Sequence, residues 1–178
     1  ADAVRLLATG ALSISDVETV AGTGEADDVV TQLSEDTTLH ILNVASVIGT
    51  VGSADVLQLH AAGSVTVQGI ETVIGYVGTS DEITLAESGS LAVSSVETLI
   101  GAGDTDVATM LNAGSMRVSG IETVIGSSGT DVVTLLETGA LAVDGVETVI
   151  GSGGEDDVVT LLAADALSVG SVASVIGT

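Results

Sequence analysis

The sequence predicts an all-β protein built as a parallel β-solenoid. The segment Val-Glu-Thr-Val-Ile-Gly recurs, with near copies, at steps of 25 to 27 residues, beginning at Val17, Val44, Ile70, Val96, Ile121, Val146 and Val172. A repeat this short cannot bury its own apolar side chains, so neighbouring repeats have to stack. Hydrophobic residues make up 46% of the chain and Tyr76 is the one Phe, Tyr or Trp residue. The core must therefore consist of β-branched and small side chains, which suit strands.

Three short strands are predicted in each repeat. The first follows the pattern D-x-V-x-L, as in residues 55–59, 81–85, 131–135 and 157–161, with Gln58 and Thr84 on its outer face. The second follows L-x-V, as in residues 91–93 and 141–143. The third is V-E-T-V-I, where Thr alternates with Glu and is expected to face inward.

Placing these three strands in one turn predicts about seven turns and a rod of roughly 34 Å, with each side chain stacked on its equivalent one turn away. No stretch sustains a 3.6-residue period, so no helices are expected. Both ends match the repeat, so no caps are expected either. Residues 1–178 are predicted to form a single repetitive solenoid, either a segment of a longer repeat protein or a filament subunit.

Charge excludes several classes of partner. The chain has 25 Asp and Glu residues against two Arg and no Lys, for a formal net charge of −23. Nucleic acids and anionic membrane surfaces are bound by clustered basic residues, so neither is expected as a partner. No apolar run reaches the roughly 18 residues of a membrane helix. Cysteine is absent, which excludes disulfide and thiol chemistry. The expected partners are divalent cations and other copies or repeats of the chain.

A glycine follows each V-E-T-V-I segment, and in the six complete loops acidic residues follow the glycine within a few positions. Residues 126–131 read G-S-S-G-T-D, and residues 151–157 form a longer version that ends in Asp156 and Asp157. The pattern resembles the RTX (hemolysin-type) calcium-binding repeats of exported bacterial proteins, whose motif is G-G-x-G-x-D-x-U-x. The doubled first glycine is missing, and the repeat of 25–27 residues is longer than the two nonapeptides of an RTX turn. The resemblance implies calcium and a bacterial, extracellular location.

A physical argument for calcium stands beside the resemblance. Calcium takes six to eight oxygen ligands from carboxylates, carbonyls and water. Stacked glycine loops with one carboxylate each would let an ion collect ligands from two neighbouring loops, for example those of Asp131 and Asp157. The alternative is that each Asp accepts backbone N–H bonds within its own turn. The candidate metal ligands are Asp28, Asp55, Asp81, Asp104, Asp106, Asp131, Asp156 and Asp157.

A second acidic column is formed by Glu18, Glu71, Glu97, Glu122 and Glu147. Equal charges one strand spacing apart repel by about 1 kcal/mol per pair in water, which a solvated face tolerates. The column is therefore interpreted as a soluble outer face, or alternatively as a surface where divalent cations bridge neighbouring rods.

An enzyme is not expected. Arg5 and Arg117 lie several repeats apart, and no repeat carries an insertion large enough to build a pocket. His40 and His60 occupy different places in the repeat and are expected not to form a pair. Ice binding, which uses flat Thr arrays, is disfavoured because the outward Thr column is one residue wide.

The sequence thus predicts a structural extracellular or cell-surface protein of bacteria: a rod, adhesin stalk, surface layer or filament stabilised by calcium at the glycine–aspartate loops. The alternative is a calcium-dependent, RTX-like secretion or folding module of an exported toxin or enzyme.

Overall fold

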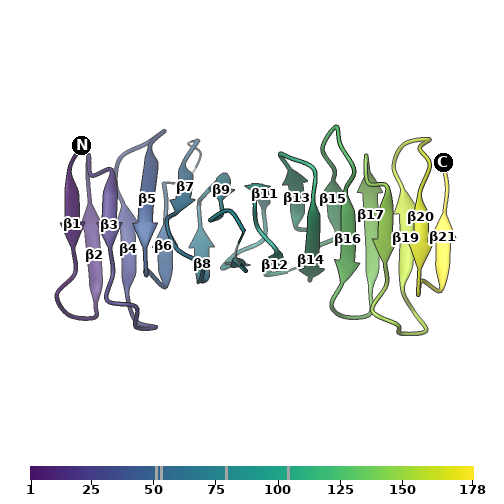
Figure 1. Ribbon diagram of the computed structural model, residues 1–178, viewed down its shortest axis with the longest axis horizontal. Coiled ribbons are helices and arrows are strands. Elements are labelled where there is room, and N and C mark those ends of the chain that lie inside the picture. The colour runs from purple at the N-terminus through teal and green to yellow at the C-terminus, as the bar shows by residue number, and fades with distance from the viewer. Residues whose placement is uncertain (51, 53, 79, 104) are drawn as a thin grey trace.

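The protein is a coil of β-strands, described by a computed structural model for residues 1–50, 52, 54–78, 80–103 and 105–178 (Figure 1). The described residues form 21 strands in two parallel sheets and no helix. The eleven-stranded sheet consists of β1 (Ala3–Arg5), β3 (Thr19–Ala21), β5 (Thr38–Leu42), β7 (Val56–Leu59), β9 (Thr72–Ile74), β11 (Ser90–Ser94), β13 (Val107–Met110), β15 (Thr123–Ile125), β17 (Ala140–Asp144), β19 (Val158–Leu161) and β21 (Ser174–Ile176). The ten-stranded sheet consists of β2 (Ala11–Ile14), β4 (Val29–Gln32), β6 (Ser46–Ile48), β8 (Ser64–Gln68), β10 (Glu82–Leu85), β12 (Thr98–Ile100), β14 (Ser115–Ser119), β16 (Val132–Leu135), β18 (Thr148–Ile150) and β20 (Ser168–Gly170).

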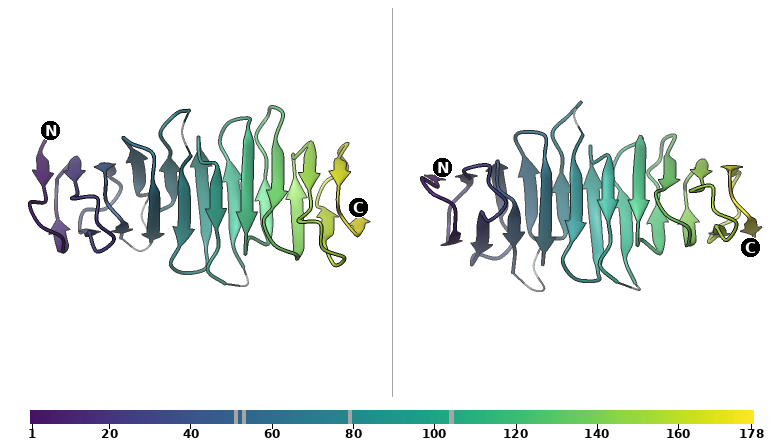
Figure 2. Two further views of the ribbon diagram at one scale, coloured as in Figure 1. Left: turned by 60° about the horizontal axis from the view of Figure 1, so that its bottom comes forward. Right: turned by 90° about the horizontal axis from the view of Figure 1, so that it is seen from below.

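The chain enters the two sheets alternately, so each turn contains two strands (Figure 2). The predicted class, an all-β parallel solenoid, is confirmed, but the prediction of three strands per turn is wrong. A turn advances 16 to 21 residues, as the pairs Leu57–Val73 and Val20–Ile41 show. It is therefore shorter than the sequence repeat, and the chain makes more than the seven predicted turns.

One sequence repeat spans three strands and hence one and a half turns. Strands of the same kind consequently alternate between the sheets: the D-x-V-x-L strands are β1, β4, β7, β10, β13, β16 and β19. Within either sheet, a strand of a given kind recurs only at every third position. The prediction that every side chain stacks on its equivalent one turn away is therefore wrong.

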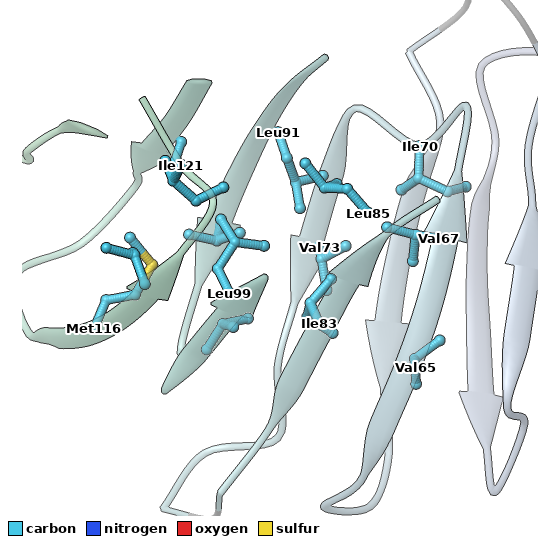
Figure 3. Close-up of a cluster of buried hydrophobic side chains, with 14 of the residues drawn as sticks. Val65, Val67, Ile70, Val73, Ile83, Leu85, Leu91, Leu99, Met116 and Ile121 are labelled. Atoms are coloured by element: carbon cyan, nitrogen blue, oxygen red, sulfur yellow. The ribbon is translucent and has the colours of Figure 1, made fainter. Parts of the chain in front are cut away.

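Apolar side chains fill the space between the sheets (Figure 3). In β10 the inward residues Ile83 and Leu85 are buried, and in β11 Leu91 and Val93 are buried. Each fully buried aliphatic side chain contributes about 1.5–3 kcal/mol relative to an exposed one. The D-x-V-x-L and L-x-V patterns thus predict the inward residues of the first two strands of each repeat correctly.

The third strand differs from the prediction. In β9 Val73 is buried, whereas Thr72 and Ile74 lie on the half-buried outer face, so the Thr column does not face inward. Two successive N–H groups, those of Glu71 and Thr72, donate to the same carbonyl oxygen of Asp55, at 3.2 and 3.1 Å. This shared acceptor interrupts the two-residue alternation before the strand begins. Ile70 and Val73 therefore both point inward although they are three residues apart.

Candidate functional site

Six of the predicted metal ligands lie at the two long edges of the coil. Asp55, Asp106 and Asp157 each come directly before a strand of the eleven-stranded sheet, and the other three come before strands of the ten-stranded sheet. All six are buried, with 0–1% of their surface exposed; they are Asp28, Asp55, Asp81, Asp106, Asp131 and Asp157. We call these six residues the edge aspartates.

Each edge aspartate binds the loop that precedes it. The Oδ2 atom of Asp131 accepts hydrogen bonds from the N–H of Ser127 at 2.5 Å and from its hydroxyl at 2.8 Å. Asp157 repeats this arrangement with Ser152, at 2.8 Å from the N–H and 2.9 Å from the hydroxyl. The buried carboxylate thereby closes the loop. It also provides a hydrogen-bond acceptor for N–H groups that would be costly to bury without one.

The second carboxylate oxygen reaches the previous turn of the same edge. The Oδ1 atom of Asp131 accepts the N–H of Gly114 at 3.0 Å, and that of Asp157 accepts the N–H of Gly139 at 3.1 Å. Gly89 donates to Asp106 in the same way at 2.7 Å. One side chain therefore joins two successive turns. This is the hydrogen-bonding alternative that the sequence left open, extended across the turn boundary.

Asp81 follows the same pattern with the N–H groups of Gly63 and Tyr76, at 3.1 and 2.5 Å, whereas Asp55 and Asp28 vary it. Asp55 accepts the Gln32 side-chain amide at 3.1 Å as well as the Thr37 N–H at 3.4 Å. Asp28 binds the N–H and hydroxyl of Thr23 through Oδ2, at 2.5 and 2.7 Å. Its Oδ1 is buried without a hydrogen-bond partner. The edge aspartates thus tolerate different partners while keeping the same position.

The Glu column completes the edge. The N–H of Asp131 donates to Oε2 of Glu147 at 2.7 Å, and the N–H of Asp81 donates to Oε2 of Glu97 at 2.8 Å. Each of these Glu residues follows its Asp by 16 residues and lies on the next turn of the same edge. The column is therefore more than a solvated outer face, since its carboxylates bind backbone N–H groups. The positions of this column alternate between the two edges, with Ala45 between Glu18 and Glu71, so the Glu residues do not stack on one another.

Hydrogen bonding lowers the pKa of two edge aspartates despite their burial. At Asp28 the Thr23 hydroxyl is the largest influence and lowers the pKa, while burial opposes it. At Asp157 burial is the largest single influence and acts to raise the pKa, but donors on Gly139 and Ser152 outweigh it and the pKa falls below the usual value of 3.8. The carboxylates are held ionised by their donors.

The loop glycine is required by close contact between turns. A Cβ added to Gly126 would lie 1.9 Å from the carbonyl oxygen of Gly145 and 3.0 Å from Oδ2 of Asp131. The same clash, at 1.8–2.1 Å, recurs at the other loop glycines, which are Gly22, Gly49, Gly75, Gly101 and Gly151. The glycine that the sequence associates with the acidic loop therefore has a steric role: it lets a carbonyl and a carboxylate approach the chain.

The geometry does not fit a calcium ion shared between consecutive loops. Asp131 precedes β16 and Asp157 precedes β19, so these two loops lie at opposite edges. On one edge the aspartates recur every third strand, about 14 Å apart. Apart from Oδ1 of Asp28, their oxygens also already accept N–H or O–H donors, which compete with a calcium ion for the oxygen lone pairs. Within the described part of the chain no three His, Asp or Glu side chains are grouped to hold a metal ion. Calcium binding stays a prediction.

The remaining predicted ligands lie elsewhere. Asp156 is exposed, beside the buried Asp157. Asp104 falls outside the described residues. Sequence reasoning missed the hydroxyl residues that bind the edge aspartates. The signal for them is a Ser or Thr directly after the loop glycine, as at Thr23, Thr50, Ser127 and Ser152.

His40 and His60 form a pair, contrary to the prediction. His40 lies in β5, and His60 directly follows β7, the neighbouring strand. The Nδ1 atom of His40 is 2.8 Å from Nε2 of His60, and the ring centroids are 5.0 Å apart in an edge-to-face arrangement. The two residues occupy different places in the sequence repeat, but a turn is shorter than a repeat and brings them together.

Comparison with known proteins adds no relative: no family model, curated protein or solved structure matches the chain. Among the described residues, no helix is long and apolar enough to cross a membrane.

Proposed function

We propose that the chain is a structural rod of a bacterial extracellular or cell-surface protein, in a stalk, surface layer or filament. The observation that carries this proposal is the continuity of the two parallel sheets, in which every neighbouring pair of strands is hydrogen-bonded from β1 to β21. Stiffness along the axis then comes from backbone ladders that run through the whole coil. Its surface needs no catalytic group for this function.

The edge aspartates support the same role. Each carboxylate whose two oxygens both have donors ties its own loop to the previous turn, as Asp106 does with Ala102 and Gly89. Hydrogen bonds to a charged acceptor contribute about 1.5–3 kcal/mol each. These residues therefore stabilise turn boundaries without a metal, so we propose a rod that folds in the absence of calcium.

One observation favours the alternative, a calcium-dependent RTX-like folding module. The structural turn of 16 to 21 residues brackets the length of two nonapeptides, whereas the sequence repeat does not. That agreement removes one difference from the RTX pattern. The two proposals differ in what calcium does: the module would be unfolded without calcium, and the rod would be folded.

Small-angle X-ray scattering in EDTA tests the rod. Eleven strands at a spacing of about 4.8 Å predict a folded length of about 50 Å, with a thin cross-section set by two sheets about 10 Å apart. Far-UV circular dichroism in the same buffer should show β-structure. An expanded, strand-poor chain that becomes compact only after calcium is added would refute the proposed rod and support the calcium-dependent module.

A further inference from the structure

The histidine pair is a feature of the coil that does not depend on the proposed rod. His40 and His60 are the two histidines of the chain, and the fold places them in direct contact. They lie on the outer side of the eleven-stranded sheet, where His40 is half-buried and His60 is exposed. Neither residue binds an edge aspartate in any contact described above, so the architecture does not explain them.

Both histidines depart from the repeat. The position of His60, directly after a D-x-V-x-L strand, holds Leu in five of the other repeats, at Leu7, Leu33, Leu111, Leu136 and Leu162. The position of His40, in the middle of an L-x-V strand, holds Ala at Ala92 and Ala142. These two substitutions in the repeat pattern bring two imidazole rings together at one place on the coil.

We propose that His40 and His60 form a surface site for a divalent transition metal, Cu²⁺ in particular. Imidazole nitrogen is a preferred ligand of Cu²⁺, Ni²⁺ and Zn²⁺. Two nitrogens in adjacent positions of a square-planar ion, each about 2.0 Å from it, are about 2.8 Å apart. The separation of Nδ1 of His40 and Nε2 of His60 is 2.8 Å. One of these two nitrogens carries the proton of the hydrogen bond, so metal binding requires that ring to shift its proton to its other nitrogen and both rings to turn their lone pairs toward one ion.

Tetrahedral Zn²⁺ fits less closely, because its nitrogen ligands are about 3.3 Å apart. Calcium fits worst, since it takes oxygen ligands. The chain's charge of −23 raises the local concentration of any cation. We expect water in the other coordination positions, because no third His, Asp or Glu is grouped with the pair among the described residues. The site is therefore open and exchangeable.

The test is titration of the chelator-treated chain with CuSO₄ by isothermal calorimetry, with electron paramagnetic resonance of the bound ion. The matched variants are His40→Ala and His60→Leu, which install the residues that other repeats carry at these positions. Their circular dichroism should equal that of the wild type. We expect one saturable Cu²⁺ per chain with hyperfine structure from two nitrogens, and at least tenfold weaker binding in each single variant.

Acidification should release the ion, because a protonated imidazole has no lone pair to donate. Excess imidazole should also compete for it. The acidic surface is the other source of Cu²⁺ binding, and the double variant measures that contribution. Equal affinity and stoichiometry in the wild type and the double variant, or a bound ion without nitrogen hyperfine structure, would overturn the proposal.

Discussion

The substitution Asp157→Asn tests the role of the edge aspartates most directly. The carboxylate accepts the N–H of Gly139 at 3.1 Å and the N–H and hydroxyl of Ser152 at 2.8 and 2.9 Å. An Asn amide keeps the shape but offers one oxygen, so its NH₂ group must face one of the two backbone donors. That donor loses a charged acceptor in a buried place.

The expected loss follows from this count. Losing one hydrogen bond to a charged group costs about 1.5–3 kcal/mol of unfolding free energy. Asp157→Ala, which leaves both backbone N–H groups unsatisfied, should cost about 2–6 kcal/mol. Asp156→Asn is the matched control, since it removes an exposed carboxylate from the same loop. It should change stability by no more than about 0.5 kcal/mol.

Urea denaturation followed by far-UV circular dichroism measures the global effect. Because repeat arrays can unfold in parts, hydrogen exchange of the Gly139 and Ser152 amides gives a local measurement. Protection of these amides should fall in Asp157→Asn and persist in Asp156→Asn. If the two variants have the same stability and the same exchange rates, the edge aspartates do not hold the turns together.

The same variant predicts a pH dependence. The pKa of Asp157 is lowered in the folded chain from 3.8, so its stabilising effect is present above that value and is lost as the pH falls through the lower folded-state pKa. The stability difference between wild type and Asp157→Asn should be constant from pH 7 to about pH 5 and shrink below pH 4. Comparing the two proteins cancels the general effect of neutralising other carboxylates. A difference that stays the same or grows as the pH falls below 4 would contradict the sign of this argument.

Four other perturbations test the fold. Gly126→Ala should lower the unfolding free energy by about 3 kcal/mol or more, because the new Cβ would lie 1.9 Å from the carbonyl oxygen of Gly145. Its control is Gly139→Ala, whose Cβ would meet no atom within 4 Å, and this variant should have nearly the wild-type stability in urea denaturation. Ser95→Gly should raise the melting temperature by an amount equivalent to about 0.5–1 kcal/mol, since Ser95 has a φ of 54° where equivalent positions in three other repeats carry Gly. In calorimetric scans, EDTA should leave the melting temperature unchanged; a rise of several degrees with millimolar calcium would restore the predicted metal role. Deleting residues 131–156, which form one whole repeat, should preserve the order of strand types and give a β-structured chain that unfolds cooperatively. Deleting residues 139–156, which form one turn, should place unlike strands together, and this variant should unfold at a lower urea concentration.

The strands were predictable from the sequence because their inward residues alternate. The D-x-V-x-L pattern identifies Leu57 and Leu59 as buried, and the structure agrees. The pattern failed at Thr72, where two N–H groups share the carbonyl oxygen of Asp55. A main-chain bond between residues 16 and 17 positions apart leaves no mark in local hydropathy. Alternation rules therefore hold within a strand and fail across the bend that precedes it.

The number of strands per turn could not be obtained from the repeat length. Three strands per repeat are compatible with a triangular turn of three, or with a flat turn of two in which the repeat covers one and a half turns. Both arrangements bury the same residues, so composition and alternation do not separate them. The position of the acids at the edges was predictable, but the identity of their partners, such as Gly114 for Asp131, depends on which strands are neighbours.

The flat turn of two strands also explains how a chain with 25 acidic residues can place carboxylates at regular intervals along the coil. With three strands per turn, equal carboxylates would stand one strand spacing apart, about 4.8 Å, and repel along the whole rod. With one and a half turns per repeat, consecutive edge aspartates alternate between edges, and those on one edge are about 14 Å apart. Because Coulomb repulsion falls as the inverse of distance, it is about one third as strong at 14 Å as at 4.8 Å. The two positions next to an edge aspartate differ: Gly89 donates its N–H to the carboxylate of Asp106, and Glu122 accepts the main-chain N–H of Asp106. The offset between repeat and turn thus keeps the edge aspartates from stacking on one another at every strand of the coil.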